Sequence, residues 1–244
     1  MEIIAHRGAS HDAPENTLAA ARLAWEQGAD ALECDVHLTR DGRLAVIHDE
    51  GTRRVAARSI EVAAASLADL QKLDVGSWKA PRFAGEKIPS LDQLLALVPA
   101  GKRVFIELKT GPAAVDELVR CLVHCTLKPA QVAVISFNLE AVRAAKKALP
   151  RCEACWLLER EPGRARPPVE EIIATCCAAE LDGLDLEAEW PVDAAFAMRV
   201  RDAGLSLYAW TVDEAATAQA LMAAGVDGIT TNRPGWLREQ IQIS

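Results

Sequence analysis

The chain alternates between short β-rich runs and helical stretches along its whole length. Strands are predicted at 3–7, 31–38, 103–109, 132–137, 153–158, 183–188, 205–211 and 228–232. Helices are predicted near 18–27, 91–98, 113–126, 139–148, 168–178, 193–203, 213–223 and 234–241. Strands that alternate with helices build a parallel sheet covered by helices. Eight such units in 244 residues predict an α/β fold closed into a (β/α)₈ barrel, the TIM barrel, as a single domain over residues 1–244. Because periodicity alone does not prove closure, an open doubly wound sheet is the alternative.

A long excursion follows the second predicted strand. The dipeptide Asp41-Gly42 lies between two alternating runs and predicts a hairpin. We expect no further helix before Ser90, where Ser90 and Gln93 form the pattern of a capping box. Residues 40–88 are therefore predicted to be an insertion within the second βα loop. Long loops at this end of a barrel usually carry function.

The charge balance and the cysteines narrow the classes of partner. The net charge is −8 at pH 7, which argues against nucleic acid, because its phosphates attract basic surfaces. No signal peptide and no apolar run long enough to span a bilayer is visible, so we expect a cytoplasmic location and no stable membrane association. The seven cysteines have no framework spacing, and we expect them to be reduced and buried. The oligomeric state stays open between monomer and homodimer.

Charged residues gather near the ends of the first three predicted strands. They are His6, Arg7, Glu33, Asp35, Glu107 and Lys109. Glu33 and Asp35 are two apart, and so are Glu107 and Lys109, so each pair lies on one face of its strand. Charges inside a barrel are costly unless they are paired or bound to metal. Three converging carboxylates favour one hard divalent cation, Mg²⁺, Ca²⁺ or Mn²⁺, over zinc, with a structural ion-pair network as the alternative.

Two histidines and an arginine add groups that suit phosphate chemistry. His6 ends the first strand, and His48, followed by Asp49, ends the hairpin. Two imidazoles beside a metal can act as general base and general acid near neutral pH. Arg7 offers a planar fork for phosphate oxygens. Glu15, within the PENT segment that starts the first helix, is a further candidate for substrate contact.

The motifs form an ordered set that resembles a known family. They are HRGAS, PENT, ECDVHLTRDG, VIHD, FIELK, ISF, AWTV and GVDGITTNRP. In this order and at these spacings they resemble the glycerophosphodiester phosphodiesterase family in its cytoplasmic bacterial form, from residue 3 to about residue 235. No single motif is specific enough to carry the resemblance, whereas the ordered set is.

The resemblance implies an activity and a role for each site residue. Such enzymes are (β/α)₈ barrels with a small insertion after strand 2, and they hydrolyse glycerophosphodiesters, such as glycerophosphocholine or glycerophosphoethanolamine, to sn-glycerol 3-phosphate and an alcohol. The implied roles are catalysis by His6 and His48, metal binding by Glu33, Asp35 and Glu107, phosphate or substrate contact by Arg7 and Lys109, and apolar walls by Phe137 and Trp210. Two positions depart from the family pattern. Cys34 stands where a bulkier apolar residue is common, and Asn232 stands where Asp is common before the last helix, which either residue can cap.

Two other functions stay as alternatives. The same constellation could cleave lysophospholipids or phosphoinositides, which would need an apolar rim that faces a membrane. A barrel that only binds a phosphorylated metabolite is the second alternative, although binding alone does not need paired acid–base groups. The sequence leaves the acid and base roles of His6 and His48 open, with His6 favoured as the base. The sequence also leaves open whether water or the glycerol 2-hydroxyl attacks the phosphorus atom.

Overall fold

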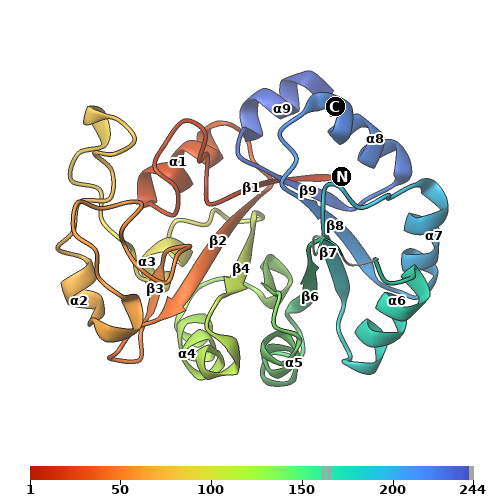
Figure 1. Cartoon of the computed structure of the whole chain (residues 1–244), viewed down its shortest axis with the longest axis horizontal. Coiled ribbons are helices and arrows are strands. Elements are labelled where there is room, and N and C mark those ends of the chain that lie inside the picture. The colour runs from red at the N-terminus through yellow and green to blue at the C-terminus, as the bar shows by residue number, and fades with distance from the viewer. Residues whose placement is uncertain (161–162, 164–165, 242–244) are drawn as a thin grey trace.

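The strands close into a barrel. The computed structural model describes residues 1–160, 163 and 166–241. Eight parallel strands pair in a ring in the order β1 (Glu2–Ala5), β2 (Ala31–Leu38), β4 (Arg103–Leu108), β5 (Val132–Ser136), β6 (Glu153–Leu158), β7 (Gly183–Glu187), β8 (Ser206–Trp210) and β9 (Gly228–Thr231). β1 pairs with β9 on one side and with β2 on the other, which confirms the predicted barrel over the open sheet (Figure 1).

Helices connect the strands and cover the outside of the barrel (Figure 1). They are α1 (Leu18–Glu26), α3 (Leu91–Leu95), α4 (Val115–His124), α5 (Leu139–Ala148), α6 (Val169–Ala178), α7 (Ala194–Asp202), α8 (Ala215–Ala224) and α9 (Pro234–Ile241), with the 3₁₀ helices η3 (Gly111–Ala114) and η4 (Pro129–Gln131) on either side of α4. α1 starts where the Thr17 hydroxyl accepts the amide of Ala20, and α3 starts at the predicted capping box of Ser90 and Gln93. Within the described residues, none of these helices has the length and apolar character needed to cross a membrane.

The segment after β2 folds beside the barrel. β3 (Leu44–Val46) pairs antiparallel with β2, which confirms the predicted hairpin. The expectation of no helix before Ser90 is wrong, because η1 (Val62–Ala64), α2 (Leu67–Leu70) and η2 (Pro81–Phe83) lie within this segment. These helices span only three or four residues, too few to show a helical period in the sequence. Apolar side chains beneath them form a small core: Ile47, Val55, Val62, Leu70, Val75 and Ile88.

The first strand ends earlier than the sequence predicted. β1 stops at Ala5, whereas the prediction extended it to Arg7. Arg7 has a φ of +55° and Gly8 a φ of +84°, so the backbone leaves the extended conformation just after the strand. His6 and Arg7 therefore lie in a turn at the carboxyl end of the barrel, and not within its wall.

Replacing Gly8 by alanine tests this turn. A Cβ atom at Gly8 would lie 2.6 Å from the backbone carbonyl carbon of Ala20, at a φ of +84° that disfavours any L side chain. We expect Gly8→Ala to lower the free energy of unfolding by about 2–5 kcal/mol, the sum of backbone strain and steric overlap. Gly101→Ala is the matched control, because Gly101 has a φ of +81° with nothing within 4 Å of its Cβ position. It should cost only about 1–2 kcal/mol. Equal losses for the two variants in urea unfolding would contradict the close contact with α1.

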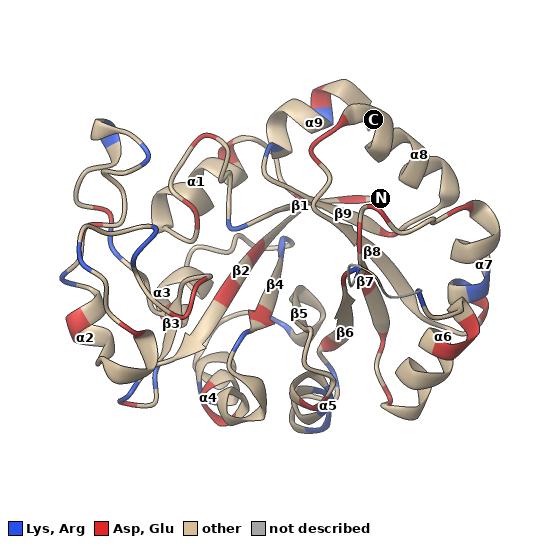
Figure 2. Cartoon of the chain, viewed as in Figure 1, with Lys and Arg blue, Asp and Glu red and all other residues tan. Residues whose placement is uncertain are grey.

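The barrel interior is polar at both ends and apolar between them. At the amino-terminal end, Arg103 donates to the carboxylates of Glu2, at 2.7 Å, and of Glu153. Tyr208 donates to Glu153 at 3.1 Å, and its ring packs edge-to-face on Phe105 with centroids 5.0 Å apart. Figure 2 shows acidic bands on β2 and β4. Arg103 is the first residue of β4, so the carboxyl end of that strand lies away from this layer. Side chains fill the amino-terminal end of the barrel. A site can therefore form at the carboxyl ends of the strands, as in other TIM barrels.

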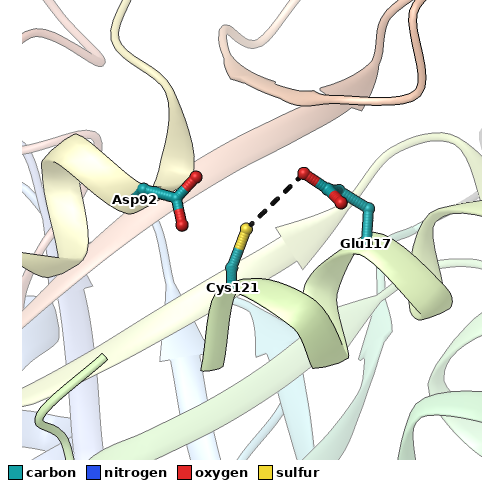
Figure 3. Close-up of side chains that lie close together, drawn as sticks. All are labelled: Asp92, Glu117 and Cys121. Carbon is teal, nitrogen blue, oxygen red and sulfur yellow. Dashed lines mark hydrogen bonds between the residues drawn. The ribbon is translucent and has the colours of Figure 1, made fainter. Parts of the chain in front are cut away.

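A cluster of two acids and a thiol lies outside the barrel, between α3 and α4 (Figure 3). One ligand atom each of Asp92, Glu117 and Cys121 approach within 4.8 Å of one another, and the thiol contacts Glu117. Arg120 pairs with Asp92 at 2.6 Å and with Glu117 at 2.7 Å, and Arg43 pairs with the same acids at 3.0 and 2.8 Å. Two guanidinium groups thus balance two carboxylates, and burial raises the pKa of the Cys121 thiol to about 12. We interpret the cluster as an ion-pair network that ties the hairpin to both helices.

The cysteines are buried with two exceptions. Cys155 of β6 faces the barrel interior, whereas Cys152, just before that strand, packs in the outer layer, so the two thiols cannot share a metal. Cys125 is half-buried. Cys177 is exposed, contrary to the prediction, because its neighbour Cys176 takes the inward position on α6.

Candidate active site

A cavity opens at the carboxyl ends of the barrel strands. It encloses about 540 Å³, counting its mouth. Most residues that the sequence predicted for the site line it: His6, Arg7, Glu33, His48, Glu107, Lys109, Phe137 and Trp210. Asp35 and Glu15 lie behind this lining, each paired with Arg7. The structure therefore gathers residues from the turn after β1 to Phe137, just after β5, with Trp210 of β8 around one opening.

Asp35 is fully buried and anchors the positive groups of the cavity. Its carboxylate lies 3.1 Å from Arg7 Nε and 3.1 Å from Lys109 Nζ, and it accepts a 2.7 Å hydrogen bond from Asn16 Nδ2. Burial alone would raise the pKa of Asp35, but Lys109 and Arg7 hold it well below its usual range. Asp35 is therefore ionised at neutral pH.

Glu33 and Glu107 bring excess negative charge beside Asp35. Oxygen atoms of the three carboxylates lie within 4.8 Å of one another. Burial and the neighbouring carboxylates raise the pKa of Glu33 well above its usual value and that of Glu107 to about 7. Arg7 and Lys109 supply two positive charges against three carboxylates, so the site has room for further positive charge.

The oxygens of this cluster can hold a cation. Among the residues that the structure describes, Glu33 Oε1 is buried without a hydrogen-bond partner, whereas Asp35 Oδ1 and Glu107 Oε1 have only Lys109 beside them. Unpaired buried carboxylate oxygens are costly, and an all-oxygen set suits a hard divalent ion. Lys109 Nζ lies 2.6 Å from Glu107 Oε1 and 3.1 Å from Asp35 Oδ1. The ion-pair alternative thus accounts for two of the three oxygens but not for Glu33 Oε1.

The two histidines of the cavity are each held through Nδ1. His6 Nδ1 lies 2.7 Å from Asn232 Oδ1, and His48 Nδ1 lies 2.7 Å from Asp49 Oδ1. Burial lowers the pKa of His6 to about 4, and it also lowers the pKa of His48. Asn232, which the sequence offered as a cap for the last helix, thus contacts a cavity residue instead.

Arg54 of the insertion completes a series of ion pairs that the sequence did not indicate. It donates to Asp49 at 2.8 Å and to the two oxygens of Glu15 at 2.6 and 2.8 Å. Glu15 also accepts from Arg7 at 3.0 Å. The series runs from His48 through Asp49, Arg54 and Glu15 to Arg7. The Glu15 carboxylate thus accepts hydrogen bonds from two arginines. Arg54 belongs to no motif in the sequence. It contacts Glu15 only because the insertion packs on the barrel.

Phe137 and Trp210 form an apolar wall of the cavity. Their rings meet edge-to-face with centroids 5.4 Å apart, and Phe137 is 38% exposed at the mouth. Lys109 Nζ lies 5.8 Å from the centroid of the Phe137 ring. Aromatic rings beside a charged group suit a ligand that joins a carbon skeleton to an anion.

Asp185 of β7 is a cavity residue that the sequence did not indicate. It is 1% exposed, and within the described part of the chain its Oδ1 has no hydrogen-bond partner. Burial, followed by the charges of Glu107 and Glu153, raises the pKa of Asp185 well above its usual value, which favours the neutral acid. A lone acid in an apolar strand carries no pattern, so the sequence contained no signal for it.

Comparisons with known proteins agree with one another over nearly the whole chain. Residues 6–236 match the model of the Glycerophosphoryl diester phosphodiesterase family. The chain is 33% identical to the glycerophosphodiester phosphodiesterase of Caldanaerobacter subterraneus over 255 residues, which cover 95% of this chain and 94% of the relative. It is 32% identical to the glycerophosphodiester phosphodiesterase of Bacillus subtilis over 249 residues, which cover 95% and 83%.

A solved structure shows the same fold. A phosphodiesterase from Oleispira antarctica, in complex with the product sn-glycerol-3-phosphate, matches this structure with a TM-score of 0.88 at 27% identity and covers 99% of this chain and 97% of its own. The described cavity residues fall within the range that the family model matches. The chain therefore belongs to the glycerophosphoryl diester phosphodiesterase family, and its activity is that of a glycerophosphodiester phosphodiesterase.

Proposed function

We propose that the chain hydrolyses glycerophosphodiesters such as glycerophosphocholine and glycerophosphoethanolamine to sn-glycerol 3-phosphate and an alcohol. The observation that carries this proposal is the meeting of two imidazoles, His6 and His48, with a buried carboxylate cluster at one cavity. A protein that only binds its ligand would not need this pair of proton-transfer groups. The Oleispira antarctica relative was solved with sn-glycerol-3-phosphate as its product, which supports the same product here.

Glu33, Asp35 and Glu107 hold one divalent cation in this proposal. The family is generally dependent on such ions. The unpaired Glu33 oxygen and the close approach of the three carboxylates support Mg²⁺ or Ca²⁺, with Mn²⁺ compatible. When bound, the ion supplies Lewis acidity and positive charge to the phosphate. The all-oxygen donor set argues against zinc.

Arg7 and Lys109 bind the phosphate group. Both line the cavity, and Asp35 holds both in place. Burial alone would lower the pKa of Lys109, but Asp35 and Glu107 raise it, so the ammonium keeps its charge. The two cations stabilise the extra negative charge of the transition state. Glu15 acts on the substrate only through its ion pair with Arg7.

His6 and His48 exchange protons with the reacting oxygens. One histidine takes the proton of the attacking hydroxyl as that oxygen bonds to phosphorus. The bond from phosphorus to the leaving oxygen breaks, and the other histidine protonates that oxygen. The attacking hydroxyl belongs either to water or to glycerol C2, and the second route forms a cyclic phosphate that water then opens. ³¹P NMR of a single-turnover mixture distinguishes the routes, because only the second passes through the cyclic phosphate.

The remaining cavity residues contact the carbon skeleton and its hydroxyls. Phe137 and Trp210 pack on the glycerol or alcohol carbons, and the neutral Asp185 carboxyl can exchange hydrogen bonds with a hydroxyl. We also infer that residues 1–244 form one catalytic domain with an insertion at 40–88. A cytoplasmic location would keep the free thiols reduced.

A substrate panel tests the proposed function. Purified protein should release sn-glycerol 3-phosphate from glycerophosphocholine and glycerophosphoethanolamine when Mg²⁺, Ca²⁺ or Mn²⁺ is present, as measured with a coupled assay. Lysophosphatidylcholine and phosphatidylinositol vesicles test the alternative substrates. Turnover confined to vesicles would favour a lipid phosphodiesterase, and no release under any cation would overturn the proposal.

A further inference from the structure

His6 is connected through one amide to a carboxylate behind it. Asn232 follows β9, and Asp213 lies between β8 and α8. His6 Nδ1 lies 2.7 Å from Asn232 Oδ1, and Asn232 Nδ2 donates to Asp213 Oδ2 at 2.6 Å. Asp213 Oδ1 accepts the backbone amide of Asn232 at 2.8 Å and the Thr231 hydroxyl at 2.9 Å. Asp213 therefore fixes both the side chain and the backbone of Asn232.

The orientation of the Asn232 amide follows from its neighbours. Both oxygens of the Asp213 side chain act as acceptors, so the amide atom 2.6 Å from Oδ2 is the NH₂ group. The amide oxygen then points the other way, where it also accepts the Ser10 hydroxyl at 2.7 Å. A reversed amide would press its oxygen against a carboxylate oxygen. The Asn232 atom that faces His6 is therefore an acceptor.

An acceptor beside Nδ1 decides which ring nitrogen of His6 carries the proton. Nδ1 has to donate, so the neutral ring keeps its lone pair on Nε2. His48 differs, because its Nδ1 faces the carboxylate of Asp49, and Arg54 holds that carboxylate in turn. A carboxylate partner favours a protonated ring, whereas an amide partner adds no charge.

We propose that Asn232, fixed by Asp213, is a positioning residue that keeps the His6 proton on Nδ1 and so presents the lone pair of His6 Nε2 as the general base. This assignment rests on the proposed function, because it takes the two histidines as the proton-transfer groups. Asn232 lies two residues before Pro234, where α9 begins, and its side-chain oxygen faces His6 and Ser10.

The charges that face His6 agree with a neutral ring. Burial and then the guanidinium of Arg7 lower its pKa to about 4, while Asp35, the Asn232 hydrogen bond and Glu15 oppose them. Asp213 is separated from the ring by the Asn232 amide. A base that is neutral at pH 7 can accept a proton without first losing one.

Removing and then rebuilding the acceptor tests the proposal. A positioned general base contributes about 10²–10⁴-fold to the rate. Asn232→Leu should remove part of this contribution and lower kcat by about 10- to 100-fold, while KM changes little. The double variant Asn232→Asp with Asp213→Asn exchanges the two side chains. It again gives His6 an acceptor that a neighbouring NH₂ group holds, so most of the lost kcat should return. Asp193→Asn, at the exposed cap of α7, controls for the loss of an acidic charge and should keep wild-type kcat.

¹⁵N NMR of labelled histidine reads the tautomer without an activity assay. In the wild type and in the exchanged double variant, His6 should show a protonated Nδ1 and an unprotonated Nε2, and His6→Gln identifies its signals. A proton on Nε2 in the wild type, or kcat of Asn232→Leu within about twofold of wild type, would overturn the proposal. So would a loss of kcat that the exchange does not restore, because that marks a merely structural role. If the wild type releases no sn-glycerol 3-phosphate, the proposed function fails while the tautomer can still be read.

Discussion

His6→Ala and His48→Ala should each lower kcat on glycerophosphocholine by about 10²–10⁴-fold, with a much smaller change in KM. In the proposed reaction each imidazole moves one proton, whereas Arg7, Lys109 and the cation would bind the phosphate. Without its histidine, each proton transfer depends on water that no residue positions. Steady-state release of sn-glycerol 3-phosphate gives both constants.

His11→Ala is the matched control for this pair. The His11 side chain is 54% exposed and contacts Asp12, outside the cavity. The His11→Ala variant should therefore keep the wild-type kcat. This result would show that the loss of an imidazole outside the cavity does not affect turnover. Wild-type turnover in both His6→Ala and His48→Ala would exclude acid–base catalysis by these residues.

Exhaustive treatment with EDTA should lower turnover by at least about 10³-fold, the rate equivalent of several kcal/mol of Lewis-acid stabilisation. Adding Mg²⁺ or Ca²⁺ should restore it. Glu107→Gln keeps the size of a ligand but removes its charge, so it should raise the half-saturating cation concentration about tenfold or more. Glu117→Gln, in the ion-pair network outside the barrel, should leave that concentration unchanged. Full activity after EDTA treatment would show that the carboxylate cluster needs no ion.

The same carboxylates give the cation-free protein a pH-dependent stability. The pKa of Glu107 is raised to about 7, so its contribution to stability is present below its unfolded pKa of 4.5 and is lost as the pH rises towards 7. A cation that binds the ionised cluster offsets this loss. The rise in Tm on adding Ca²⁺ should therefore be larger at about pH 7.5 than at about pH 5. An equal rise at both values would contradict binding at Glu107.

The period of the strands was sufficient to group the acidic residues. Glu33 and Asp35 are two apart, and the parallel register places Asp35 beside Glu107 of the neighbouring strand. Side-chain alternation along β2 and β4 then brings the carboxylates to one side of the wall. The closed barrel followed in the same way, from the number of strand–helix units and the length of the chain.

The partners of the two histidines could not be predicted in this way. Asn232 contacts His6 across 226 positions of sequence, and only the closure of β9 on β1 brings the two together. Arg54 reaches Glu15 across 39 positions, from an insertion without a regular period. Such contacts depend on how separate segments pack, and no spacing within either segment encodes them.

The layer of Arg103, Glu2, Glu153 and Tyr208 gives the barrel a closed floor opposite the cavity mouth. A substrate bound in the cavity and its two products would then share one passage, past the aromatic pair of Phe137 and Trp210. A fragment bound nearer the floor would leave only after the fragment nearer the mouth. The order of product release would thus follow from depth in the barrel, and not from the affinity of each product alone.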